Sequence, residues 1–141
     1  MFITALNEGR SSAAKKFLTP QHLQANQVLI TCVLEGHWTL IVLDVAGKTM
    51  TLVDSGNARH NGLTLVSHFF ESMDEMPHSW TSQHSKEVAK QTNGYDCEVH
   101  MCQNAADVAY ALTFSFSPNK VHAIRKAMTF EILTGALMPR E

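Results

Sequence analysis

The chain has 141 residues, of which 45% are hydrophobic and 17% are charged, and its formal net charge is −2. These values are typical of a globular protein with one hydrophobic core. No basic run is longer than Lys15-Lys16, so nothing predicts binding to nucleic acid or to an anionic membrane surface. No apolar run reaches the roughly 20 residues that a membrane-spanning helix needs.

The cysteines and the N-terminus bear on the compartment. Three cysteines, at positions 32, 97 and 102, are an odd number, which argues against a disulfide framework and for a reducing environment. Residues 1–6 are too few for a signal-peptide core and lack a preceding basic region. We therefore expect an intracellular protein of the cytoplasm or nucleus, or one delivered without a standard signal, and we expect a monomer.

The sequence up to residue 53 predicts mainly strands. The expected elements are weak order or a short helix over 1–16, a short helix from Thr19-Pro20 to about residue 26, and strands over 28–34, 38–45 and 49–53. The run 38–45 is nearly all apolar and β-branched, as in a central strand covered on both faces. The tight turn 46–48 makes the last two strands a hairpin.

The sequence after residue 53 predicts mainly helices. The expected elements are a helix over 63–73 capped by Asn61 and ended by Pro77, a short strand over 79–84, a helix from Cys97 to about Thr113, and a helix from Ser117-Pro118 to Gly135. The inward residues of the last helix are expected to be Val121, Ile124, Ala127, Met128 and Ile132. Cys32 and Cys102 lie on apolar faces, and we expect both in the core.

This order of elements predicts an α+β fold, in which helices pack on a small, mostly antiparallel sheet. We expect one domain over 1–141. It would comprise a short N-terminal segment (1–26), a core (27–113) and a C-terminal helix (117–135).

Cys97 is the candidate nucleophile. It ends the polar, glycine-containing turn 91–97, and helical spacing begins directly after it. The free N–H groups and the dipole at a helix N-terminus favour a thiolate over a thiol. A buried core cysteine is the commonest fate of a free thiol, but the polar turn before Cys97 favours the nucleophile.

A cysteine nucleophile needs a base and a group that orients the base. His37 opens the central strand, and Asp54 ends the next one. Because the two strands of a hairpin are antiparallel, the start of one lies beside the end of the other. We therefore expect His37 and Asp54 to be close in space.

Gln91 is the candidate oxyanion donor. It lies six positions before Cys97, and a turn of that length can fold the amide back beside the sulfur. Losing one oxyanion donor typically costs roughly 100- to 1,000-fold in rate. The backbone N–H of Cys97 is a second candidate donor.

These residues carry a family resemblance. Three motifs follow one another along the chain: His37-Trp38, Asp54-Ser55 and Gln91-Thr92-Asn93-Gly94-Tyr95-Asp96-Cys97. In their order and in their expected structure, they resemble the motifs of the Ulp1/SENP cysteine peptidases. The resemblance covers roughly residues 28–112. It implies a papain-like, Ulp1-like core and cleavage of SUMO or NEDD8 from precursors and conjugates, with no cofactor.

The resemblance also implies roles. His37 would be the base, Asp54 its orienter and Cys97 the nucleophile. Gln91 would be the oxyanion donor. Trp38 would help form the narrow channel for the modifier's Gly-Gly tail.

We also expect Asn93 and Gly94, in the turn before Cys97, to bind substrate.

Two features depart from the family pattern. The family usually has glycine directly after the cysteine, whereas this chain has Glu98, and a carboxylate beside a thiol opposes thiolate formation. Family domains also carry a longer segment before the His-Trp strand, whereas 36 residues precede His37 here. The chain is thus expected to be a compact or N-terminally shortened member.

Three alternatives remain. Glu98 and the short N-terminal segment favour a weakly active or inactive module that binds a ubiquitin-like protein. An acyltransferase of the same clan would use acetyl-CoA, but no basic cluster for its phosphates is evident. Cys97, His100 and Cys102 have a poor spacing for zinc, since residue 102 leaves the helix face of the other two, and we expect no metal.

Overall fold

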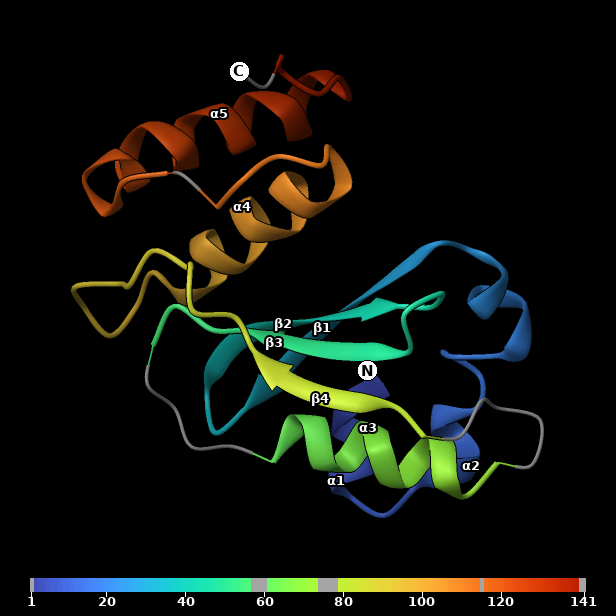
Figure 1. Cartoon of the computed structure of the whole chain (residues 1–141). Coiled ribbons are helices and arrows are strands. Elements are labelled where there is room, and N and C mark those ends of the chain that lie inside the picture. Colours follow the sequence, from blue (N-terminus) through green and yellow to red (C-terminus); the bar gives the residue numbers. More distant parts are fainter. Residues whose placement is uncertain (1, 57–60, 74–78, 115, 140–141) are drawn as a thin grey trace.

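A four-stranded sheet lies between two groups of helices in the computed structural model, which describes residues 2–56, 61–73, 79–114 and 116–139 (Figure 1). The strands, in spatial order, are β1 (Gln27–Leu34), β2 (His37–Asp44), β3 (Thr49–Val53) and β4 (Thr81–His84). The first three are antiparallel, and β4 runs parallel to β3. The α+β class with a mostly antiparallel sheet is thus confirmed.

Helices cover both faces of this sheet. In chain order they are α1 (Phe2–Asn7), α2 (Ser11–Ala14), the 3₁₀ turn η1 (Pro20–Gln24), α3 (Gly62–Glu71), α4 (Cys97–Ala109), the 3₁₀ turn η2 (Pro118–Lys120) and α5 (Val121–Thr134). Figure 1 shows α1, α2 and α3 on one side of the sheet, and α4 and α5 on the other. The candidate nucleophile thus approaches the sheet from the side of α4.

Strand β2 is covered on both faces, as its apolar run predicts. Ile41 and Leu43 belong to the larger core cluster with α1 and α3, whereas Leu40 and Val42 pack with Met101 of α4. All four side chains are at most 9% exposed. Alternation along a strand sends neighbours to opposite faces, so one strand serves two cores and fixes the helices relative to the sheet.

Two turns place the start of β2 beside the end of β3. Glu35 and Gly36 both have positive φ, 54° and 77°, the backbone of a tight turn between antiparallel strands. Leu34 then pairs with His37. On the other side of β2, Leu40 pairs with Val53, so His37 lies near the residues that follow β3.

Helix α4 ends at Ala109, so the expectation that it continues to about Thr113 is wrong. Ala111 has a φ of 55°, its N–H bonds the Val108 carbonyl, and the Leu112 N–H bonds the Asp107 carbonyl. This is the Schellman pattern that closes a helix. The sequence does not predict this helix end, because alanine occupies the position where glycine is usual.

Cys102 and Ile132 are exposed, so the prediction that both face the core is wrong. They line a hollow of about 370 Å³ between α4, α5 and the C-terminal segment. The face of α4 that is buried carries Cys97, Met101 and Asn104 instead. Cys32, by contrast, is fully buried in the core as expected, and burial raises the pKa of its thiol to about 11.

The other described element boundaries lie within a few residues of those expected from sequence. The 3₁₀ turn η1 begins at Pro20, Gly135 ends α5 with a φ of 67°, and Asn61 precedes α3 without a side-chain capping bond. Pro77 lies outside the described residues. Of the helices that are described, none combines the length and apolarity needed to cross a bilayer.

Side chains in the two cores are buried, whereas many on the surface of α5 are exposed, and this difference in burial gives a test. Phe70 is 1% exposed and stacks on Trp80, whereas Phe130 of α5 is 54% exposed. Phe70→Ala should lower the free energy of unfolding by about 3–5 kcal/mol. Phe130→Ala should cost less than about 1 kcal/mol. Urea unfolding measures both, and equal losses would contradict this assignment of the core.

Candidate functional site

His37 and Asp54 form a hydrogen-bonded pair at one end of the sheet. His37 Nε2 lies 2.6 Å from Asp54 Oδ1, and the two side chains are 16% and 11% exposed. With Nε2 as the donor to the carboxylate, Nδ1 is the nitrogen left to accept a proton. The hairpin argument from sequence is confirmed by this contact.

The Asp54 carboxylate is held in its charged form. Burial alone would raise its pKa, but the hydrogen bonds from His37 and from the Gly56 N–H (2.8 Å), with the charges of His37 and Lys90, lower it below its usual value. A carboxylate kept ionised in this way orients an imidazole and stabilises its protonated form.

Gly56 makes room for the imidazole. A Cβ at this position would lie 2.8 Å from His37 Cε1 and 3.0 Å from Nε2. Real Cβ atoms do not approach so closely, so any larger residue at position 56 would displace the ring from Asp54.

Four hydrogen bonds tie the segment before the Cys97 turn to the end of β3. Lys90 Nζ donates to the carbonyls of Asp54 (2.9 Å) and Gly56 (3.1 Å). The Gln91 N–H donates to the Ser55 carbonyl (2.9 Å), and the Ser55 hydroxyl donates to Gln91 Oε1 (2.8 Å). We call these bonds the strand-end clamp. They bring residues about 36 positions apart to the same place.

The clamp also sets the orientation of the Gln91 amide. Because Oε1 accepts from Ser55, the Nε2 end points toward the turn, where it donates to the Asn93 carbonyl at 2.6 Å. An amide nitrogen carries two hydrogens. The arrangement therefore presents a donor group on the side of the turn that leads to Cys97.

Asn93 shapes the turn from within. Its Oδ1 accepts from the N–H groups of Tyr95 and Asp96 (both 3.1 Å), and its Nδ2 donates to Asp96 Oδ2 at 2.7 Å. Gly94 is exposed, and a Cβ added to it would meet nothing within 4 Å. The Asn93 side chain is thus occupied internally, and Gly94 leaves open space above the turn.

Cys97 is the first residue of α4, as predicted, and is 5% exposed. Its thiol faces Glu98, with Sγ 3.9 Å from Oε2. Among the described residues it makes no hydrogen bond to His37. The side chain of Asp96 makes no capping bond to α4, so it does not compete for the N–H groups of the first turn.

The structure thus brings some of the predicted site residues into direct contact but not others. His37 and Asp54 are in contact, and Gln91 is tied to Ser55 beside them. Trp38 is half-buried and packs against the core cluster next to α4. Cys97 begins the helix at the end of the same turn.

Sequence reasoning missed three contributors. Gly56 carried only a turn signal, and Lys90 only its place beside Gln91. Arg125, on α5, bonds both Asp96 and Glu98 from 27 to 29 positions away, and no local pattern marks it. A side chain that acts across such a separation is visible only in the folded chain.

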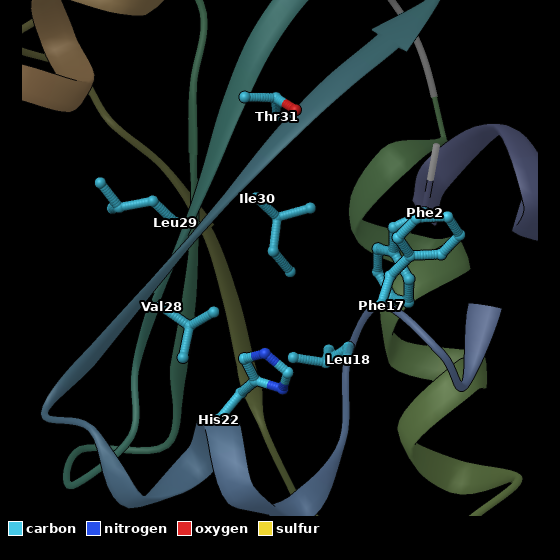
Figure 2. A pocket seen from close by; sticks show the side chains of 8 residues that line it. All are labelled: Phe2, Phe17, Leu18, His22, Val28, Leu29, Ile30 and Thr31. Carbon is cyan, nitrogen blue, oxygen red and sulfur yellow. The ribbon is translucent and has the colours of Figure 1, made fainter.

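A hollow of about 350 Å³ lies elsewhere on the molecule. Figure 2 shows it between β1 and the N-terminal segments, with Phe2, Phe17 and Leu18 on one side and Ile30 of β1 on the other. None of the predicted site residues lines it.

Within the described ranges, no three His, Cys, Asp or Glu residues gather as a metal ion would require. His100 is 1% exposed and its ring lies 4.7 Å from that of Phe116. Burial lowers its pKa.

Taken together, the arrangement has the parts of nucleophilic catalysis. An oriented imidazole and a side-chain amide lie at one end of the sheet, and the turn that follows the amide leads to a thiol at a helix N-terminus. Such a set supports attack on a carbonyl and stabilisation of the oxyanion that results.

The space under the imidazole is testable. Gly56→Ala should displace His37 and abolish the low-field imidazole N–H signal of its bond to Asp54 in NMR spectra. Gly94→Ala is the matched control, because a Cβ there meets nothing within 4 Å, and it should keep that signal. Circular dichroism should show both variants folded. An unchanged His37 signal in Gly56→Ala would contradict the packing described here.

Comparison with known proteins identifies relatives. The model of the Ulp1 protease family, C-terminal catalytic domain, matches residues 4–137. The chain is 24% identical to human sentrin-specific protease 2 over 148 residues, which cover 97% of this chain and 25% of that protein. It is 29% identical to a sentrin-specific protease of Caenorhabditis elegans over 122 residues, covering 79% and 17%. The chain thus spans a quarter or less of the length of these relatives.

Solved structures share the fold. The Ulp1 protease domain in complex with Smt3, the yeast ortholog of SUMO, matches with a TM-score of 0.77 at 23% identity, over 94% of this chain and 65% of that one. The catalytic domain of the Chaetomium thermophilum Ulp1-like SUMO protease matches with a TM-score of 0.79 at 20% identity, over 98% and 60%. The expected Ulp1-like core is confirmed.

Proposed function

Because this chain belongs to the Ulp1 protease family, we propose that it is a cysteine peptidase that cleaves after the C-terminal glycine of a ubiquitin-like modifier. The observation that carries the proposal is the 2.6 Å bond between His37 and Asp54 at the sheet end to which the strand-end clamp ties the Cys97 turn. His37, Asp54, Gln91 and Cys97 take the roles that the family resemblance gives them.

The proposed reaction proceeds in two stages. His37 Nδ1 accepts the Cys97 proton, and the sulfur attacks the carbonyl carbon of the modifier's terminal glycine. The second N–H of Gln91 and the backbone N–H of Cys97 donate to the oxyanion of the tetrahedral intermediate. The amine departs with the proton from His37 and leaves a thioester, which water then hydrolyses with His37 again as base.

We propose SUMO as the modifier. The names of the relatives support it, since the curated ones are sentrin-specific proteases and the solved ones act on or bind SUMO or its yeast ortholog. NEDD8 has no such support. Trp38 would line the channel for the Gly-Gly tail, and Asn93 and Gly94 would shape the turn beside it.

The proposal extends to the organisation of the chain. We propose a single peptidase domain over 1–141, with the catalytic core in 27–113, that acts as a monomer without a cofactor. Three free cysteines support a reducing compartment, the cytoplasm or nucleus.

A second candidate function is a non-catalytic module that binds a ubiquitin-like protein. The observation that favours it is the Glu98 carboxylate 3.9 Å from the Cys97 sulfur, because a nearby negative charge opposes thiolate formation.

Electrophilic probes separate the two functions. SUMO, NEDD8 and ubiquitin, each with a thiol-reactive group at its C-terminus, are incubated with the protein and adducts are counted by mass spectrometry. We expect an adduct with SUMO that Cys97→Ala abolishes and His37→Ala slows. Cys102→Ala, which removes an exposed thiol, should leave it intact. SUMO binding without any adduct would favour the non-catalytic module.

The Ser55–Gln91 bond gives a kinetic prediction. Ser55→Ala removes the donor that fixes Gln91 Oε1, so the amide can turn its oxygen toward the oxyanion. We expect kcat to fall about 10- to 100-fold with little change in KM, and Gln91→Ala to cost roughly 100- to 1,000-fold.

The control for this prediction is Ser82→Ala on the exposed strand β4, which should cleave at the normal rate. The double variant Ser55→Ala/Gln91→Ala should be no slower than Gln91→Ala, since both act through one amide. Additive losses would refute the role given to Ser55.

A further inference from the structure

Two carboxylates flank the candidate nucleophile. Asp96 directly precedes Cys97 and is 9% exposed, and Glu98 directly follows it, with Oε2 3.9 Å from the sulfur. Negative charges close to a thiol disfavour the thiolate. On their own, these neighbours would work against a nucleophile at position 97.

One cation contacts both carboxylates. Arg125 Nη2 lies 2.8 Å from Asp96 Oδ1, 2.5 Å from Glu98 Oε1 and 3.3 Å from the Tyr95 carbonyl. The contact crosses between elements, because Arg125 belongs to α5, which Figure 1 shows against α4 on the side away from the sheet. Both ion pairs raise the pKa of Arg125, and hydrogen bonds from Asn93 and Arg125 lower the pKa of Asp96.

The two oxygens of Glu98 therefore have different partners. Oε1 is held by the guanidinium and Oε2 faces the thiol. A carboxylate paired with arginine carries much less uncompensated charge toward a third group than a free one.

Building on the proposed function, we propose that Arg125 is a positioning residue that compensates Glu98 and Asp96 and so preserves the nucleophilic reactivity of Cys97. Glu98 stands where the family usually has glycine, and Arg125 offsets the charge that this residue introduces. The reactivity of the thiol then depends on the docking of α5.

The charged groups around Cys97 come from four places. The turn supplies Asp96, α4 supplies Glu98, and α5 supplies Arg125. The sheet end supplies the His37–Asp54 pair with Lys90 on its backbone. His100 also lies on α4, and its lowered pKa favours its neutral form.

The test measures the reactivity of the thiol itself. Alkylation of Cys97 by iodoacetamide is followed by mass spectrometry across a pH series in the wild type, Arg125→Gln, Glu98→Gln and the double variant. Lys126→Gln is the matched control. It removes the same charge from the neighbouring exposed position of α5, and in the described structure Lys126 makes no ion pair with either carboxylate.

Arg125→Gln should slow labelling about tenfold at neutral pH and move the pH profile upward by about one unit, because Glu98 is then uncompensated. Glu98→Gln should label at least as fast as the wild type. The labelling rate of the double variant should recover to within about threefold of the wild-type rate. Lys126→Gln should label at the wild-type rate.

Two results would overturn the proposal. One is an Arg125→Gln profile that superimposes on that of the wild type. The other is a double variant as slow as Arg125→Gln, which would mean that Arg125 only supports the fold of the turn. Because labelling needs no substrate, this readout is separate from the proposed function. Failure of every modifier probe, with the labelling pattern as predicted, would reject peptidase activity but keep the role of Arg125.

Discussion

The strand-end clamp is the constraint on which the site depends. The hairpin β2–β3 brings His37 beside Asp54, and α4 presents Cys97 at its first turn. The bonds from Lys90 and Gln91 to residues 54–56 relate these two units. Three of the four end on backbone carbonyls, but only the bond from the Gln91 N–H joins two main-chain groups, so the clamp depends on the side chains of Lys90, Ser55 and Gln91.

Charge balance adds a second layer to this geometry. The sheet end holds an ionised Asp54 against His37, and the turn holds Asp96 and Glu98 against Arg125. Asp54 is thus paired with His37, whereas Asp96 and Glu98 share one cation, Arg125. A partly exposed ion pair contributes little to stability, and Arg125 is 43% exposed in its side chain. Its importance therefore lies in the local potential at the sulfur and less in the free energy of unfolding.

Sequence reasoning reached the features that local patterns encode. The alternation and turn signals predicted the hairpin, and from its antiparallel pairing the contact of His37 with Asp54 followed. Sequence reasoning failed where tertiary packing determines which side chains are buried or in contact. Cys102 fits an apolar helical stripe, yet α5 does not pack closely enough to bury it. Gly56 and Arg125 act through a close approach and through a contact between helices, neither of which leaves a periodic signal.

Strand β4 gives the site an uneven stability. It pairs with β3 at the edge of the sheet, and all four of its side chains are exposed, so little apolar burial holds it in place. Segments of this kind open locally at a small fraction of the global unfolding free energy. Since β4 leads directly into the segment of Lys90 and Gln91, its opening would loosen the nucleophile's side of the site while the His37–Asp54 hairpin stays folded. We therefore expect the His37–Asp54 hairpin and the Cys97 turn to behave as different cooperative units of one chain.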